Sequence, residues 1–252
     1  MDKMKRIRIV GLCLIAAFAF SAIAVASASA AGPEFYECAK VKGGKFEKGC
    51  GKEGGKGGFE RKAVKLPSKY TGTNGTSVLT VFVPGIGIVG DTKCTKAKDA
   101  GAIISPTQTE TTVTFEKCES SGKKCTSVGE KTKGDIKTNT LLGTLVATEE
   151  SKTGVGVTIT AKSTENSAEF ECEGLKIKTK GAVTGEDTGN TEKAAKTSKN
   201  VFEVNAGGEP TIKTEGSEFT LLTTINTGTE ENTVPSGEST VASLKGKEIG
   251  VN

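Results

Sequence analysis

The chain has 252 residues, of which 35% are hydrophobic and 25% charged, and its formal net charge is +4. It contains no histidine, which excludes Ser–His and Cys–His nucleophile pairs and imidazole metal ligands. With no tryptophan and two tyrosines, aromatic platforms for stacking on sugars are scarce as well. The composition argues against an ordinary hydrolase, so we expect a protein that is not an enzyme.

Residues 1–30 have the pattern of a secretory signal peptide. Lys3, Lys5, Arg6 and Arg8 precede an apolar run, and Ala-Ser-Ala triplets follow it. A basic segment, an apolar segment and small residues at the cleavage site are typical of such a leader. An uncleaved anchor is the alternative, because about 18 apolar residues just reach the length that spans a bilayer. We expect cleavage and a secreted or cell-envelope protein.

The charge of the chain belongs largely to this leader. Without its four basic residues and one acidic residue, 30 basic and 29 acidic residues remain, which gives no reason to expect a nucleic-acid partner. We also expect no membrane contact after cleavage. One basic cluster remains between Lys40 and Lys65, with nine basic residues against three glutamates. The sequence allows an anionic cell-envelope polymer or glycan as its partner, but a solvated loop is the favoured interpretation.

The cysteines of the remaining chain predict a disulfide framework. An even number of cysteines in an exported protein is typical of disulfides, here three. Proximity in the sequence favours one bridge between Cys38 and Cys50 and one between Cys118 and Cys125, which leaves Cys94 to pair with Cys172. Without histidine or a Cys-x-x-Cys pair, we expect no zinc site.

Period-two alternation predicts the fold class, and residues 168–183 show it best. Phe170 and Cys172 alternate with glutamates, and beyond Gly174 Leu175 and Ile177 alternate with lysines. This pattern predicts two half-buried antiparallel strands, or one bent strand, with Cys172 in the core and the charges in solvent. Similar alternation recurs in residues 111–118, 135–146 and 155–159. Residues 77–83 are apolar enough for a central strand, and further short strands are predicted at residues 201–205, 210–214, 218–225 and 240–244.

We therefore predict an all-β protein, an antiparallel sandwich or irregular barrel stapled by disulfides. Residues 65–252 form the β domain, and residues 31–64 form a small Gly- and Lys-rich module clamped by Cys38 and Cys50. Asn74-Gly75 is the strongest local hairpin signal, and residues 194–199 are predicted to form a helical turn. Leu, Ile, Val and Phe make up roughly one residue in five, which predicts a thin core.

No residue is predicted to be catalytic, cofactor-binding or metal-ligating. Ser120 and Lys123 have the Ser-x-x-Lys spacing of some acyl enzymes, but they lie on a glycine-containing loop. Asp187 and Asn190 belong to a group of oxygen-bearing side chains of the kind that hard cations prefer, yet the calcium-loop spacing is absent and we expect a solvated hairpin end. No glutamate stands in an apolar context that would raise its pKa.

Three motifs carry a resemblance to known proteins. They are Phe-Glu-Lys-Cys118 with Cys125 nearby, Gly-Asp-Ile-Lys-Thr-Asn-Thr-Leu-Leu-Gly-Thr-Leu145, and Glu-Phe-Glu-Cys-Glu-Gly-Leu-Lys-Ile-Lys-Thr-Lys-Gly181. Over roughly residues 94–184 the chain resembles a group of exported, uncharacterised β-rich proteins of soil actinobacteria. The resemblance implies a β-rich scaffold and an extracytoplasmic location, and it implies no activity.

The function expected from the sequence is a binding or structural role outside the cytoplasm. Two alternatives stay open. One is an extracellular hydrolase that uses paired carboxylates on a sheet face. The other is a polyanion binder that acts through the segment between Lys40 and Lys65.

Overall fold

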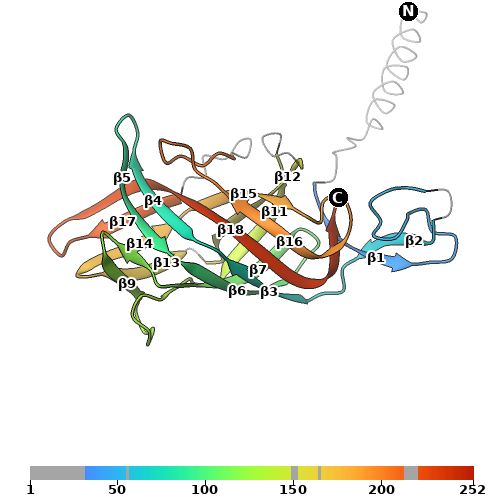
Figure 1. Ribbon diagram of the computed structural model, residues 1–252, viewed down its shortest axis with the longest axis horizontal. Coiled ribbons are helices and arrows are strands. Elements are labelled where there is room, and N and C mark those ends of the chain that lie inside the picture. Colours follow the sequence, from blue (N-terminus) through green and yellow to red (C-terminus); the bar gives the residue numbers. More distant parts are fainter. Residues whose placement is uncertain (1–31, 55–56, 149–152, 164–165, 213–220) are drawn as a thin grey trace, which may run out of the picture. The chain divides into compact units, whose positions relative to one another are not determined.

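The computed structural model describes residues 32–54, 57–148, 153–163, 166–212 and 221–252. The predicted signal peptide lies outside the described residues, so its cleavage stays a prediction. The predicted all-β class is confirmed: the structure is an antiparallel barrel (Figure 1) of eight strands with additional strands, and it contains three disulfides.

The described residues form strands that are mostly segments of longer strands. One to three successive segments follow one another along the same wall, and each such run is called a continuous strand. The segments of a run are separated by residues 75–76 in one run and by as many as residues 203–220 in another. The strands are β1 (Phe35–Lys40), β2 (Phe59–Ala63), β3 (Ser68–Asn74), β4 (Ser77–Val83), β5 (Gly87–Cys94), β6 (Lys96–Ile103), β7 (Gln108–Glu116), β8 (Glu119–Ser120), β9 (Lys123–Ser127), β10 (Ile136–Lys137), β11 (Leu141–Ala147), β12 (Val155–Ala161), β13 (Ala168–Cys172), β14 (Leu175–Lys180), β15 (Ala182–Thr188), β16 (Ala195–Phe202), β17 (Leu221–Asn226) and β18 (Glu231–Val251).

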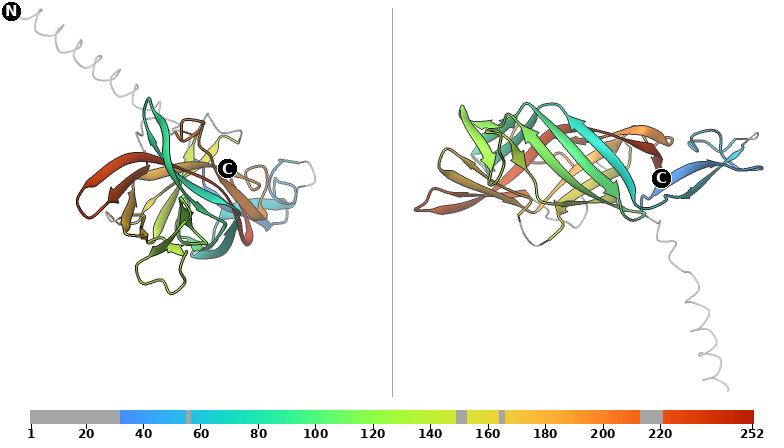
Figure 2. Two further views of the ribbon diagram at one scale, coloured as in Figure 1. Left: turned by 60° about the vertical axis from the view of Figure 1, so that its left-hand side comes forward. Right: turned by 90° about the horizontal axis from the view of Figure 1, so that it is seen from below.

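The barrel is an up-and-down meander of eight continuous strands. In chain order they are β3–β4, β5–β6, β7–β8, β9–β11, β12–β13, β14–β15, β16–β17 and β18, and each is antiparallel to the next. The long strand β18 closes the ring by pairing with both β3 and β4. Figure 2 shows these long, inclined strands from two further sides. Closure leaves the barrel strands without a free edge.

Residues 168–183 form the two predicted half-buried strands, with Ile177 buried as predicted but Leu175, beside the turn, exposed. Ala168, Phe170 and Cys172 of β13 are buried and alternate with exposed glutamates. A two-residue turn joins β13 to β14, since Cys172 pairs with Leu175. Both turn residues have positive φ, 47° at Glu173 and 93° at Gly174, as a type I′ turn requires.

The predicted hairpin at Asn74-Gly75 is wrong. Asn74 pairs with Ala242 and Val78 pairs with Ser239, so β3 and β4 run in the same direction along β18. Four residues on one strand face three on the other, and the extra residue makes a β-bulge. Pairing with β18, which is distant in the sequence, overrides the local preference for a turn.

The prediction of a helical turn at residues 194–199 is also wrong. Ala195–Phe202 forms β16, which lies between β15 and β18 and pairs with both. The predicted short strand at residues 240–244 is the middle of β18, which extends from Glu231 to Val251. A strand in the wall of a closed barrel is paired on both sides, so weak local propensity does not break it.

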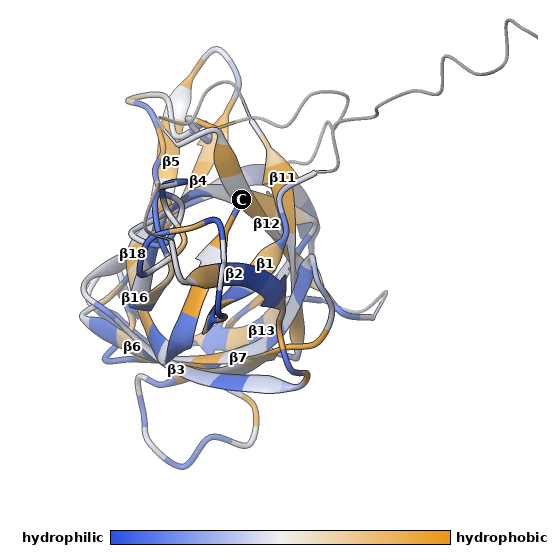
Figure 3. Cartoon of the chain, turned by 90° about the vertical axis from the view of Figure 1, so that its right-hand side faces the viewer, coloured by the Kyte–Doolittle hydropathy of each residue, from blue (hydrophilic) through white to orange (hydrophobic). Residues whose placement is uncertain are grey.

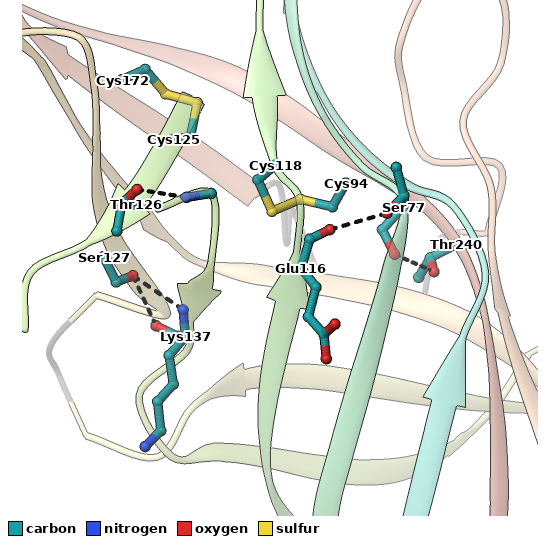
Figure 4. Close-up of a disulfide and its surroundings, with 12 residues drawn as sticks. Ser77, Cys94, Glu116, Cys118, Cys125, Thr126, Ser127, Lys137, Cys172 and Thr240 are labelled. Carbon is teal, nitrogen blue, oxygen red and sulfur yellow. Dashed lines mark hydrogen bonds between the residues drawn. A yellow bond between two sulfur atoms is a disulfide. The ribbon is translucent and has the colours of Figure 1, made fainter. Parts of the chain in front are cut away.

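The structure confirms three disulfides but corrects two of the predicted pairings. Cys38 is bonded to Cys50 as predicted. The other bridges join Cys94 to Cys118 and Cys125 to Cys172 (Figure 4), so the predicted pairs Cys118–Cys125 and Cys94–Cys172 are wrong. Cys125 lies opposite Cys172 in the register of β9 and β13, with Cα atoms 4.1 Å apart. Strand register, rather than the shortest loop, determines the pairing.

The segment before the barrel is a ribbon of β1 and β2. Arg61 on β2 lies over the rings of Tyr36 and Phe46, 4.7 and 4.8 Å from their centroids. Two of its nitrogens donate to the carbonyl oxygen of Cys50 at 3.1 and 3.0 Å. The start of β1 also pairs with the end of β18, and residues 32–252 form one compact unit. A domain boundary between residues 64 and 65 stays a prediction.

Candidate functional site

The interior of the barrel contains a cavity of about 140 Å³. Side chains from all eight continuous strands line it, because alternate residues of each strand point inward. Figure 3 looks into the barrel from the end at which β1 and β2 lie. An eight-stranded barrel has room either for its own side chains or for one small ligand. Several inward side chains are small, among them Thr92, Thr111, Thr138, Ala168 and Ala242, and space is left.

Most of the large side chains around the cavity are apolar. Phe115, Phe170 and Phe202 contribute aromatic rings, and Leu141 and Ile159 contribute aliphatic groups. Phe170 also belongs to the main buried cluster, which contains both barrel disulfides. An apolar cavity with a few polar groups is the usual character of a small-molecule site.

The polar groups of the cavity come mainly from three neighbouring strands. Asn74 and Ser77 lie on β3–β4, Asp99 on β5–β6, and Glu238 and Thr240 on β18. The hydroxyls of Ser77 and Thr240 are 2.7 Å apart and hydrogen-bonded (Figure 4). The Ser77 and Thr240 hydroxyls are therefore hydrogen-bond partners of one another. Among the described residues, no such bond joins the carboxyl groups of Asp99 and Glu238.

Asp99 is held close to the wall of β3. It pairs in register with Gly72, and its side chain lies over that residue, where a Cβ atom would collide with the carboxylate. With its amide oriented to satisfy its neighbours, Asn74 donates a hydrogen bond of 2.8 Å to Asp99 Oδ2. Asp99 Oδ1 is buried and has no hydrogen-bond partner among the described residues. Burial raises the pKa of this carboxyl to about 6.

Glu238 is the second acid of the cavity. It pairs in register with Leu79 and faces the cavity. Burial raises its pKa to about 7, and the nearby charge of Asp99 adds to the rise. Within the described part of the chain, no lysine or arginine forms an ion pair with Glu238 or Asp99. Buried carboxylates without a cation are costly, and protonation is their usual response.

A second cavity of about 70 Å³ lies next to the first. Tyr70 and Leu244 line both cavities, so they form the wall between them. Burial raises the pKa of Tyr70, and hydrogen bonds with Thr109 and Thr111 act in the opposite direction. The Tyr70 ring also packs over Gly101, which leaves no space for a side chain there. The Tyr70 side chain is therefore held in place between the two cavities.

The prediction that Asp187 and Asn190 lie at a solvated hairpin end is wrong. Both line this cavity and are only 3% and 4% exposed, so they do not lie on a solvated hairpin end. Burial raises the pKa of Asp187 to about 7. The Oδ1 atoms of both residues lack a hydrogen-bond partner among the described residues. The reason is that Asp187 belongs to β15, whose inward side chains face the barrel interior.

Asp99 and Glu238 are the residues that sequence reasoning missed. The expectation that no glutamate has a raised pKa is wrong for Glu238. A signal was present, because Asp99 has the same strand parity as buried Ala97 and Ile103. Glu238 likewise shares parity with buried Ser236 and Thr240. An acid on the apolar face of an alternating strand is the pattern that marks such a buried carboxyl.

The other sequence candidates lie away from the cavity. Ser120 and Lys123 lie at opposite ends of the β8–β9 turn, and Lys123 pairs with Glu173 at 2.7 Å. The Ser120 hydroxyl donates to the carbonyl of Asp91, so the two residues form no nucleophile pair. The described lysines of the basic cluster are exposed on and around the β1–β2 ribbon, at positions 40, 42, 45, 48, 52, 62 and 65.

Among the described residues, no group of three or more Cys, Asp or Glu side chains is arranged to hold a metal ion. The described part of the chain also has no helix of the length and apolarity needed to cross a membrane. Comparisons with family models, with curated proteins and with solved structures found no match to this chain.

Proposed function

We propose that this chain is an exported, non-enzymatic binding protein that holds a small ligand inside its barrel. One observation carries the proposal: a largely apolar cavity of about 140 Å³ that also contains two carboxyl groups without a cationic partner among the described residues. For comparison, an engineered apolar cavity of about 150 Å³ binds benzene. The ligand is accordingly of about that size.

The test is a titration of the whole protein with toluene, followed by methyl NMR. The methyl resonances of Val113, Leu141 and Ile159, which line the cavity, are expected to shift. Exposed Val128 serves as the internal control and is expected to stay unchanged. Ala242→Leu fills the cavity and should abolish the shifts while the protein stays folded. If the cavity methyls of the unmodified protein respond neither to toluene nor to polar analogues of the same size, the proposal is wrong.

Export is part of the same proposal. Three disulfides indicate that the chain folds in an oxidising environment. We infer a secreted or cell-envelope location, with removal of residues 1–30. The intact mass of the protein recovered outside the cytoplasm should correspond to a chain that starts at Ala31. A mass that includes the leader would support the anchor instead.

The paired-carboxylate hydrolase gains one supporting observation, the shared cavity of Asp99 and Glu238. The volume argues against it, because a space of benzene size does not hold the two units that flank a scissile bond. A single-turnover assay with small glycosides and esters tests this alternative. Hydrolysis that Glu238→Gln abolishes would favour the enzyme over the binding protein.

The polyanion binder is supported by the exposed lysines of the β1–β2 ribbon. Its test is retention on heparin, which should fall steeply with salt for an electrostatic contact. Replacing Lys42, Lys45 and Lys48 with glutamine should shorten retention, whereas the same change at Lys131, Lys133 and Lys176 serves as a charge-matched control. Equal effects of the two sets would exclude a specific role for the ribbon.

A further inference from the structure

Two carboxyl groups in the barrel interior have no cationic partner among the described residues. Asp99 and Glu238 line the same cavity, and neither takes part in an ion pair with another described residue. The lysines next to Asp99 in sequence, Lys96 and Lys98, are exposed and both pair with Glu116. These two lysines lie on the outer face of β6, opposite to Asp99. The Asp99 and Glu238 carboxyl groups can therefore pair with a cation that a ligand supplies.

We propose that the ligand of this cavity is a small organic monocation, an amine on an apolar body of about benzene size, whose ammonium group binds the Asp99 and Glu238 carboxyl groups and compensates one of their two negative charges. This inference rests on the proposed function, because it names the ligand class of the same cavity. The apolar body occupies the space beside Phe170 and Phe202, and the ammonium group lies at the acids.

The surroundings of the acids suit an ammonium group. Its N–H donors need acceptors, and the buried Oδ1 of Asp99 is an acceptor without a donor among the described residues. The hydroxyl oxygens of Ser77 and Thr240 bond to one another and keep lone pairs that accept further N–H groups. Charge-assisted hydrogen bonds of this kind are roughly twice as strong as neutral ones.

Other ligand classes fit less well. A Ca²⁺ ion takes six to eight oxygen ligands, and the described residues around the cavity supply two acids and no group of three or more metal-binding side chains. An anion would meet two carboxylates and no described cation. A neutral apolar molecule would fill the space but would leave the acids without a partner. The raised pKa values of both carboxyls fit exchange of a proton for the ammonium group.

The experiment compares four molecules of nearly equal shape: benzylamine, benzyl alcohol, toluene and benzoate. Each is titrated into the whole protein at about pH 8, where the carboxylates are ionised, and the cavity methyl resonances report binding. We expect benzylamine to bind about tenfold more tightly than benzyl alcohol, the ratio that corresponds to about 1.4 kcal/mol for a charge-assisted contact. Toluene is expected to bind weakly, and benzoate not at all.

Variants then separate the charge from the cavity. Asp99→Asn combined with Glu238→Gln keeps the side-chain sizes and removes both charges, so it should abolish the preference for benzylamine and leave toluene binding intact. Intact toluene binding also shows that the variant is folded. Glu169→Gln, which removes a carboxylate from the outer face of β13, is the matched control and should keep the preference.

The outcomes distinguish this inference from the proposed function. Equal affinities for benzylamine, benzyl alcohol and toluene would overturn the amine and leave the small-ligand function standing. A preference for benzylamine that survives removal of both carboxyls would also overturn it. Failure of all four molecules to shift the cavity methyls would overturn both proposals.

Discussion

Asp99 on β6 lies directly opposite Gly72 on β3, and its carboxylate occupies the space that a side chain at position 72 would need. A methyl group there would also meet a methyl of Leu244 on β18. Three neighbouring strands therefore meet at one glycine, and its missing side chain is what lets an acid lie against the barrel wall. The buried carboxyl and the glycine are one structural unit.

Gly72→Ala is expected to destabilise the protein by about 1–3 kcal/mol, the usual cost of overpacking a well-packed site. The reason is the collision of the new Cβ with Asp99 and Leu244. Urea unfolding provides the measurement. Gly75→Ala is the matched control, because nothing lies within 4 Å of its added Cβ and its φ is not positive. Equal stabilities of the two variants would contradict this account of Gly72.

The stability of the folded protein should fall as the pH rises from about 4 to about 7. Burial raises the pKa of Asp99 to about 6 and those of Asp187 and Glu238 to about 7. The folded state then binds more protons than the unfolded state across this window, so raising the pH favours unfolding. The pKa of Glu116 is lowered to about 2 by Lys96 and Lys98. This group therefore makes the stability rise with pH, but only below about pH 4.5.

Asp187→Asn tests which group carries this dependence. The variant should match the unmodified protein near pH 4 and exceed its stability near pH 8, because each unit of pKa shift is worth about 1.4 kcal/mol. Urea unfolding at several pH values measures the difference. Glu186→Gln, on the neighbouring residue, is the control and should leave the slope unchanged. A difference between Asp187→Asn and the unmodified protein that does not vary with pH would refute the assignment.

Loss of either barrel disulfide should cost several kcal/mol. The bridge between Cys94 and Cys118 spans 24 residues and the one between Cys125 and Cys172 spans 47. Loop entropy predicts losses of about 3.4 and about 4 kcal/mol when each pair is replaced with alanine. Denaturant unfolding measures both. Peptide mapping without reductant must also recover these two links, and a Cys118–Cys125 peptide would show that the pairing is different.

Arg61→Lys should loosen the β1–β2 ribbon. Lysine keeps the charge but lacks the planar group that lies over Tyr36 and Phe46 and donates twice to the Cys50 carbonyl. We expect a loss of about 0.5–2 kcal/mol, seen as faster amide exchange in β1 and β2. Lys62→Arg, at the exposed neighbouring position, should leave exchange unchanged. Unchanged exchange in Arg61→Lys would show that the stacking contributes little.

The fold class and much of the local structure can be predicted from the order of the residues. The alternation of Phe170 and Cys172 with glutamates placed one face of β13 in the core, because side chains of a strand alternate between its faces. The Cys38–Cys50 bridge followed from a short loop. Both depend on residues that are close in sequence, where geometry follows from spacing.

Features that depend on how the strands pair become visible once the chain is folded. Pairing with β18 turned Asn74-Gly75 into a bulge, and the register of β5–β6 with β7–β8 placed Cys94 opposite Cys118. It also brought Asp99 and Glu238, which are distant in the sequence, into one cavity. Strand parity places each acid on an inward-facing position, but it does not show that the two meet. Their proximity follows from strand register, which is set by the whole ring of strands and not by any local stretch.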